Sequence, residues 1–391
     1  MVRRGFAVAT LGAAIALAVV VAASARNAAA PAAPAAQAAQ LVSCSNASIA
    51  MMGPFTGPAA SIGQEQLKFA KYALAKFNRD NKTKFKFVES DTQLDAKQAS
   101  TRSVQLKSNA NVLGVVGPAG SQEVQAIART FAGMPYISSS ATNTSLTIGS
   151  KRIKSFWRVV GNDVAQAATD ARFIASTLKA KKVYIIDDQT SYSVPLGNNV
   201  QRNLKAAGVS VSRNSVNQNV SDFSSLVTKV SSDTDVVFLP WQLAAKAQLF
   251  YQQLKEQGKK AIIVGSDGLD SGDFLGANGS YFSAFAPDLH TTANKATIAI
   301  LNGYKRQYGV FKSNFGPPAY VAMQVMFVAL KAACANGTAT RSEVMSKMQS
   351  TDLKTTILGY PMKFNLNHDP VSARFYLFKV VNGKTRPVLG G

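Results

Sequence analysis

The chain has 391 residues, 47% of them hydrophobic, which is enough for two domains that each bury a core. The formal net charge is +22, yet the basic residues are scattered, without an Arg-rich arm or a zinc or helix-turn-helix signature, so we expect no nucleic-acid partner. The charge favours attraction to an acidic cell wall or membrane surface, or else only a solvated basic surface.

The N-terminal segment has the pattern of a secretory signal peptide. Arg3 and Arg4 precede an apolar run from Phe6 to Ala23, and small-residue sites follow it. We expect a signal peptide over residues 1–25, with cleavage as late as residue 40, and a disordered Ala/Pro-rich spacer over 26–43. An uncleaved anchor is the alternative, since the run approaches the ~20 residues that span a bilayer. Either reading makes the protein exported.

Strands and helices then alternate along the chain. We expect, in chain order, a strand at 48–53, a helix at 64–78, a strand at 84–91, a helix at 96–108 and a strand at 111–117 with its own helix. The pattern restarts with a helix at 164–178 and a strand at 182–188, and two further units follow. Such alternation predicts parallel sheets with right-handed crossovers, and the restart predicts two sheets.

The last third breaks this alternation. Helices are expected at about 294–308, 318–335 and 342–350. The second of these carries Gln324 and Lys331, so we interpret it as a buried core helix rather than a membrane span. The segments 361–369 and 373–384 alternate like the two strands of an antiparallel hairpin.

Small hydroxylated and acidic residues follow three of the expected strands. Ser121 is the expected N-cap of the helix after the strand at 111–117, Ser138 to Thr142 end another strand, and Asp187, Asp188 and Tyr192 follow a third. In open α/β sheets, ligands bind beyond the carboxyl ends of the strands, where helix N-termini supply free N–H groups. The pattern indicates a site for a small carboxylate.

No catalytic pattern accompanies this site. The sequence has two histidines, His290 and His368, and lacks both a G-x-S-x-G elbow and a His/Cys/Asp cluster at metal-ligand spacing. We therefore expect a protein that is not an enzyme and uses no cofactor or metal.

The two cysteines leave two readings open. Cys44 and Cys334 form a disulfide, or Leu41-Val42-Ser43-Cys44 is a lipobox and Cys44 carries a lipid anchor. The disulfide is favoured, because a lipobox normally adjoins the apolar run, and here a spacer separates the two.

An ordered set of motifs resembles one family. The segments "IAMMGPFTGPAASIGQEQ", "VVGPAGSQEV", "YISSSATNTSLT", "YIIDDQTSYSVPLG", "DFSSLVTKV" and "GSDGL" are similar to type I periplasmic binding proteins of the leucine/isoleucine/valine-binding kind, over about residues 45–385. The resemblance implies an α/β fold of two Rossmann-like lobes with parallel sheets, joined by three crossovers, with the ligand trapped by hinge closure. It puts lobe one at 45–161 plus 287–358 and lobe two at 162–286 plus 359–391.

The resemblance also implies site residues. Ser121 would hold the ligand carboxylate, and Ser140, Ala141 and Thr142 would grip the carboxylate and ammonium. Tyr192 and Asp267 would lie on lobe two, with Asp267 as the ammonium partner.

Two further positions depart from the family pattern. Ile62 stands where the branched-chain binders have an aromatic residue, and Pro240-Trp241-Gln242-Leu243 replaces their usual aromatic pair. We still expect Ile62 and Trp241 to line the site.

Together these features predict an exported solute-binding protein, periplasmic or associated with the cell surface. It would capture an amino acid or related small carboxylate and deliver it to an ABC transporter permease, and we expect a monomer. The alternative is an extracellular sensing module of the same fold that feeds a signalling partner.

Overall fold

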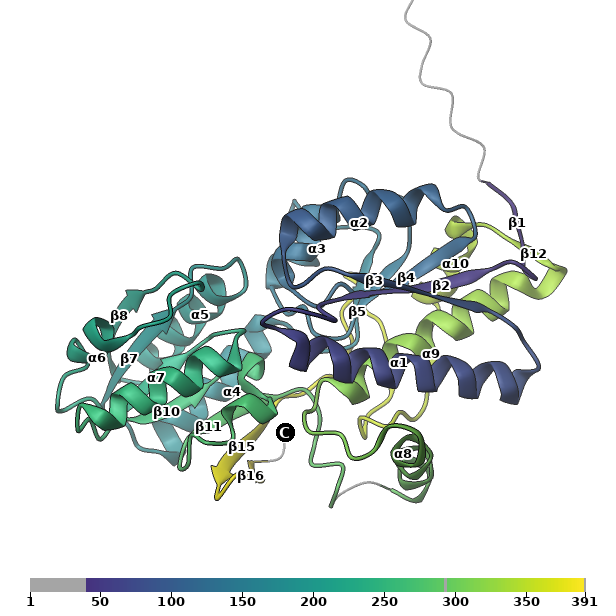
Figure 1. The fold of residues 1–391 in the computed structure, drawn as a ribbon. Coiled ribbons are helices and arrows are strands. Elements are labelled where there is room, and N and C mark those ends of the chain that lie inside the picture. The colour runs from purple at the N-terminus through teal and green to yellow at the C-terminus, as the bar shows by residue number, and fades with distance from the viewer. Residues whose placement is uncertain (1–39, 292–293, 390–391) are drawn as a thin grey trace, which may run out of the picture. The chain divides into compact units, whose positions relative to one another are not determined.

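The structure of the chain is a computed structural model that describes residues 40–291 and 294–389. These residues belong to one compact unit that contains two α/β lobes (Figure 1). The expected signal peptide and residues 26–39 of the spacer lie outside the described residues.

Lobe one is built on a five-stranded parallel sheet in the order β3-β2-β4-β5-β6. Alternate side chains of β2 point to opposite faces, as a period of two requires. Ile49 and Met51 pack against α1 and α9, and Ala50 and Met52 pack against α2 and α3, which lie on the other face (Figure 1). The strands are β2 (Ser48–Gly53), β3 (Lys86–Asp91), β4 (Val112–Val116), β5 (Tyr136–Ser138) and β6 (Phe156–Arg158).

The helices of lobe one come from both ends of the chain. They are α1 (Ala60–Asn81), α2 (Ala96–Ser108), α3 (Ser121–Ile127), α8 (Lys295–Tyr308), α9 (Gly316–Ala333) and α10 (Arg341–Gln349). Helix α2 has the predicted bounds, whereas α1 is longer than predicted at both ends. Its first turn passes so close to the preceding loop that a Cβ at Gly63 would lie 2.0 Å from the Pro54 carbonyl oxygen, so only glycine fits there.

Helix α9 is the core helix of lobe one. Among the described residues, only the segment Gly316–Asn336 is long and apolar enough to cross a membrane, and 67% of its apolar 18-residue stretch is buried inside the protein. Its side chains pack against α1, β2 and β4, which agrees with the predicted core helix.

Lobe two is built on a seven-stranded mixed sheet in the order β16-β15-β11-β10-β9-β7-β8. Its strands are β7 (Lys182–Asp187), β8 (Ser210–Ser215), β9 (Val236–Leu239), β10 (Ile262–Gly265), β11 (Tyr281–Ala284), β15 (Tyr376–Val381) and β16 (Lys384–Leu389). Helices α4 (Asp163–Arg172) and α5 (Ser193–Ala206) cover one face, and α6 (Ser224–Thr228) and α7 (Ala244–Glu256) cover the other.

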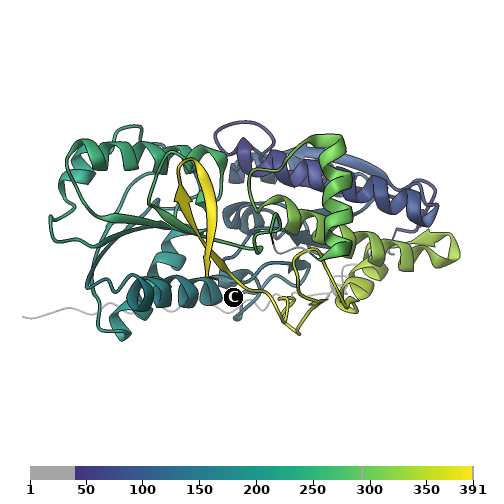
Figure 2. The same cartoon turned by 90° about the horizontal axis from the view of Figure 1, so that it is seen from below.

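The predicted hairpin of residues 361–369 and 373–384 is wrong. Strand β14 (Met362–Lys363) pairs with β13 (Asp352–Leu353), and β15 pairs with β16 at the edge of lobe two (Figure 2). The turn Asn382-Gly383 connects β15 directly to β16, and both its residues have positive φ, which suits a tight hairpin. The predicted helix at 164–178 also differs, because α4 ends at Arg172 and a π-helical turn continues to Thr177.

The strands of the two sheets fall in the segments that the resemblance assigned to the two lobes. The exact lobe boundaries stay a prediction. A disulfide joins Cys44 to Cys334, next to the short ribbon of β1 (Val42–Ser43) and β12 (Thr338–Ala339), as predicted. This bond uses the Cys44 sulfur that the lipobox reading would need.

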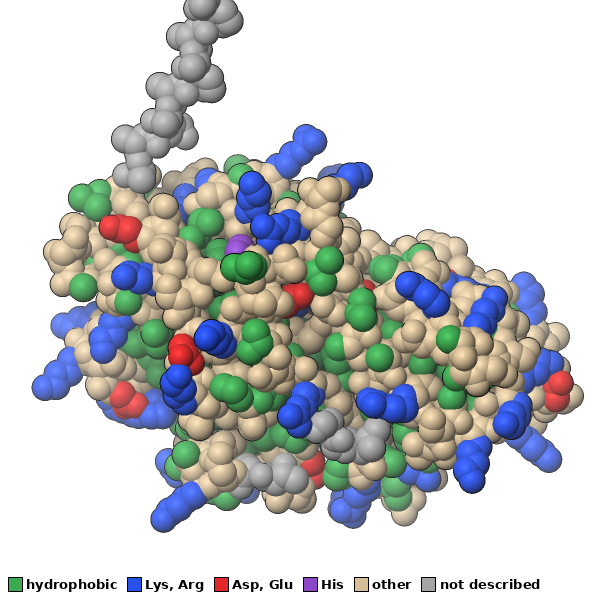
Figure 3. Space-filling model, turned by 180° about the vertical axis from the view of Figure 1, so that it is seen from behind, with side chains coloured by type: hydrophobic (Ala, Val, Ile, Leu, Met, Phe, Trp, Pro, Cys, Tyr) green, Lys and Arg blue, Asp and Glu red, His purple; other side chains and the backbone are tan. Residues whose placement is uncertain are grey.

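The basic side chains do not gather in one place on the face that Figure 3 shows. On the face shown in Figure 3, Lys and Arg are spread over the surface with few acidic neighbours. This distribution fits a generally solvated basic surface.

Candidate functional site

A cavity lies between the two lobes, beyond the carboxyl ends of their strands. Its volume is about 20 Å³, roughly the space of one water molecule. Lobe one contributes six residues from the junctions after β2, β3, β4 and β5, and Phe315 from the segment before α9. Lobe two contributes residues from the junctions after β7, β9 and β10. The lining residues are Ile62, Leu94, Ala119, Gly120, Ser121, Ser140, Tyr192, Gln242, Asp267, Gly268 and Phe315.

Two of the predicted hydroxyl groups lie on the lobe-one side of this cavity. Ser121 is the first residue of α3 rather than its N-cap, which is Gly120, so the predicted cap is wrong by one residue. Its hydroxyl accepts a hydrogen bond from the Asn143 N–H at 3.2 Å. The Ser140 hydroxyl donates to the Ala119 carbonyl oxygen and accepts from Gln66 Nε2, both at 2.9 Å.

Ala141 and Thr142 lie behind this wall and are not among the lining residues. The N–H groups of Ser140 and Ala141 both donate to Ser138 Oγ, so in this arrangement they hold the loop together. The Thr142 hydroxyl is fully buried and makes no hydrogen bond of standard geometry. It lies beside Asp163 and acts to lower the pKa of that carboxyl.

Asp267 faces the cavity from lobe two. Its Oδ1 accepts hydrogen bonds from the Tyr192 hydroxyl at 2.7 Å and from Gln166 Nε2 at 2.6 Å. Burial raises the pKa of Asp267 to about 6, although these two hydrogen bonds act to lower it. A carboxylate buried this deeply without a cation is a strong attractor for an ammonium group.

A set of buried polar side chains on α4 lies next to Asp267. Asp163, Gln166 and Asp170 are spaced i, i+3 and i+7, so they share one face of the helix, and all three are fully buried. Burial raises the pKa of Asp163 to about 7, with a further increase from Asp267, while Thr142 and Arg158 oppose it. Burial also raises the pKa of Asp170 well above its usual range.

These three side chains carry unused hydrogen-bonding capacity. Both carboxylate oxygens of Asp163, Gln166 Oε1 and Asp170 Oδ1 have no hydrogen-bond partner of standard geometry. Sequence reasoning missed them. The available signal was three polar residues on the same helical stripe as Ala167 and Ala171, which are buried in the core.

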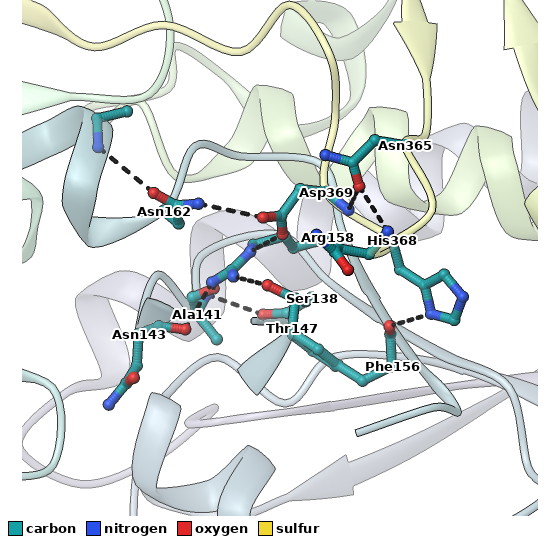
Figure 4. Close-up of polar contacts among 12 residues, drawn as sticks. Ser138, Ala141, Asn143, Thr147, Phe156, Arg158, Asn162, Asn365, His368 and Asp369 are labelled. Atoms are coloured by element: carbon teal, nitrogen blue, oxygen red, sulfur yellow. Dashed lines mark hydrogen bonds and ion pairs between the residues drawn. The ribbon is translucent and has the colours of Figure 1, made fainter. Parts of the chain in front are cut away.

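Arg158 organises the loop that carries the predicted lobe-one residues (Figure 4). It is fully buried, and its Nε forms an ion pair with Asp369 Oδ1 at 2.7 Å. Its guanidinium also donates to the carbonyl oxygens of Ala141 at 3.1 Å and Asn143 at 2.9 Å, and to the Thr147 hydroxyl. The arginine therefore fixes the backbone on both sides of Thr142. Sequence reasoning missed it too, although a lone charge inside the apolar strand "FWRVV" was a signal.

The structure separates Trp241 from the cavity. Trp241 packs among Phe223 and Phe250 in the core of lobe two, and its indole N–H donates to the Ile186 carbonyl oxygen at 2.7 Å. The next residue, Gln242, lines the cavity instead. Of the eight predicted ligand-binding residues, Ile62, Ser121, Ser140, Tyr192 and Asp267 meet at the cavity. Ala141, Thr142 and Trp241 do not, and all eight roles stay predictions.

The described parts of the chain contain no candidate metal centre. No group of three or more His, Cys, Asp or Glu side chains there is arranged to hold a metal ion. His368 stacks on Trp157 and His290 stacks on Phe311, both away from the cavity lining. The cavity between the two lobes is therefore the candidate site.

Comparisons with known proteins agree with this geometry. The chain is 29% identical to an amino acid binding protein of Pseudomonas aeruginosa over 56% of this chain and 60% of that protein. It is 25% identical to Leu/Ile/Val-binding protein homolog 3 of Brucella melitensis over 86% of this chain and 92% of that one. The fold matches a branched-chain amino acid transporter substrate-binding protein of Streptococcus pneumoniae, solved in complex with isoleucine, with a TM-score of 0.78, 23% identity and coverage of 88% and 99%.

The profile of the family described as "Periplasmic binding protein" matches residues 46–385, which is most of the chain. The chain therefore belongs to the periplasmic binding protein family.

Proposed function

We propose that this protein captures an α-amino acid, or a closely related small carboxylate, between its two lobes and delivers it to an ABC transporter permease. Its family is one of solute-binding proteins rather than enzymes, and family membership implies an exported, periplasmic location. The permease partner follows from the family as well.

One observation carries the proposal: the two walls of one cavity carry complementary groups for a zwitterion. On lobe one, the N-terminus of α3 and the hydroxyl of Ser121 suit a carboxylate, because helix N-termini expose N–H donors and favour negative charge. The Ser140 hydroxyl would donate to the same carboxylate after releasing the Ala119 carbonyl oxygen. On lobe two, Asp267 and the Tyr192 hydroxyl suit an ammonium group.

The small volume of the cavity supports capture by hinge closure. A space of about 20 Å³ is roughly that of one water molecule, so we expect the lobes to move apart when a ligand reaches Asp267. Closure around the ligand would then bury its two charged groups against opposite lobes.

The sharpest test replaces Asp267 with Asn and measures binding by titration calorimetry. The control is Asp273→Asn, which removes an exposed carboxylate six residues along the chain. For the amino acid that binds the parent protein, we expect Asp267→Asn to weaken binding at least a hundredfold, because the ammonium loses a buried ionic partner worth about 3 kcal/mol or more. The control should bind like the parent.

A deaminated analogue of the same ligand completes the test. It should bind the parent weakly and lose little further affinity in Asp267→Asn, since it has no ammonium to pair. Equal losses for the amino acid and its deaminated analogue would contradict the ammonium role. Tight binding of acids without an ammonium group would mean that the protein is a receptor for carboxylates but not for amino acids.

A further inference from the structure

The two lobes meet through a small set of side chains at the edge of the cavity. Gln122 on α3 and Gln242 after β9 form a reciprocal amide pair, with Nε2 to Oε1 distances of 2.9 and 3.2 Å. Beside this pair, Ala59 and Leu94 of lobe one form a buried apolar cluster with Leu243 of lobe two. We call these five residues the interlobe clasp.

The clasp is also part of the cavity wall. Leu94 and Gln242 belong to both, and both are largely buried. A Cβ at Gly268 would lie 2.8 Å from Gln242 Cα, so the clasp begins directly beside the turn that carries Asp267. Any part of a ligand that extends from the charged groups toward this side meets Leu94 and Gln242.

Leu94 is held in an unusual conformation. Gln93 and Leu94 have φ values of +54° and +63°, a region that residues other than glycine seldom occupy and that persists only where the surroundings enforce it. The Leu94 carbonyl oxygen accepts from Gln122 Nε2 at 3.3 Å. Gln122 therefore forms hydrogen bonds to both the Leu94 backbone and the Gln242 side chain, so it links the apolar residues of the clasp to its amide pair.

The polar atoms of the clasp are already paired. Gln242 Nε2 also lies 3.4 Å from the Thr190 hydroxyl, and the Gln242 N–H donates to Asp188 Oδ2 at 3.3 Å. A ligand chain that pushed Gln242 aside would break both hydrogen bonds of the amide pair, and an apolar chain supplies none to replace them. An apolar chain that ends before the clasp avoids this loss and contacts Ile62, Leu94 and Phe315.

We propose that the interlobe clasp closes the cleft over the end of the ligand side chain and limits the length of that side chain. Gln242 is then a specificity-determining residue. The closure rests on the structure alone, whereas the length limit rests on the proposed function. Two experiments separate them.

The first experiment needs no ligand. Spin labels on Lys97→Cys and Lys205→Cys, at exposed positions of α2 and α5, report the distance between the lobes by pulsed electron paramagnetic resonance. We expect Gln122→Ala and Gln242→Ala each to shift the distribution to longer distances. Gln125→Ala removes an exposed glutamine of α3 that does not line the cavity; it is the matched control and should leave the distribution unchanged. The same distribution in all four proteins would overturn the clasp.

The second experiment compares straight-chain α-amino acids from alanine to norleucine by calorimetry in the parent, Gln242→Ala and Gln125→Ala. We expect the optimum of Gln242→Ala to move to a ligand at least one methylene longer, with about a fourfold gain for each added methylene that becomes buried. A uniform loss of affinity with the same optimum would overturn the length limit. If no member of the series binds the parent, the amino-acid function fails, and the distance measurement still decides whether the clasp exists.

Discussion

Replacing Arg158 with Met should destabilise the protein far more than removal of a surface charge. The guanidinium is fully buried and Asp369 is 8% exposed, so the change leaves a nearly buried carboxylate unpaired. It also leaves the carbonyl oxygens of Ala141 and Asn143 without this donor. Breaking a buried ion pair from one side costs about 3–5 kcal/mol, and we expect about 4 kcal/mol in the free energy of unfolding.

The matched control is Lys354→Ala. Lys354 pairs with Asp352 at 2.6 Å, but the two side chains are 81% and 46% exposed, so we expect a loss of about 0–1 kcal/mol. Urea denaturation at fixed pH, with the disulfide intact, measures both variants. Arg158→Lys should also lose most of the stability that Arg158 contributes. A lysine ammonium cannot replace the planar guanidinium, which donates to one carboxylate and two carbonyl oxygens at once.

A difference below about 1 kcal/mol between Arg158→Met and the control would refute this reasoning. It would mean that solvent reaches Asp369 in the variant, or that the loop around Thr142 holds its shape by other contacts. Ligand titration on the same variant gives an independent readout, since a displaced loop also displaces Ser140 and weakens carboxylate binding.

Three further predictions concern protonation, the disulfide and a close backbone approach. The pKa of Asp267 is about 6 in the folded protein against its ordinary 3.8, so the folded state binds this proton more tightly than the unfolded chain does. The contribution of Asp267 to stability should therefore fall as pH rises from about 4 to 6, which thermal unfolding between pH 4 and 8 measures. Affinity for an ammonium ligand should rise through pH 6 as the carboxyl ionises, which calorimetry over the same range measures. Replacing Cys44 and Cys334 with Ser should cost about 2–4 kcal/mol in urea unfolding, since the bond closes a loop across 290 residues, and should leave affinity unchanged because neither residue lines the cavity; a large change in affinity would contradict this. Gly268→Ala should lower the melting temperature and abolish binding, because its Cβ would lie 2.1 Å from the Trp241 carbonyl oxygen, while Gly272→Ala, whose nearest neighbour is a Lys312 carbon at 3.9 Å, should behave like the parent.

The amino-acid sequence predicted the elements where local signals were strong. Helix α2 has the expected bounds because Asp95 caps its start, accepting a hydrogen bond from the Gln98 N–H, and because its buried positions, Ala99, Ser103 and Leu106, recur at helical spacing. The hydroxyl-rich junctions also predicted which edge of each sheet forms the site. Local signals failed for the C-terminal hairpin, because alternation of apolar and polar residues indicates a strand but does not show which other strand it pairs with.

The same division applies to the site. Hydroxyls and acids that follow buried strands are visible in the sequence, so Ser121, Tyr192 and Asp267 were found. Trp241 and Gln242 are neighbours, and only the twist of the chain after β9 decides that the indole enters the core and the amide faces the cavity.

The sequence by itself determined the alternation of strands and helices and the polar chemistry at the strand ends, because these depend on residues close together in the chain. The tertiary structure alone decided the pairings across long separations: Arg158 with Asp369, Asp267 with Gln166, and Gln122 with Gln242. Each pairing depends on how segments far apart in the sequence pack together, and no local propensity encodes which distant partner will satisfy a buried polar group.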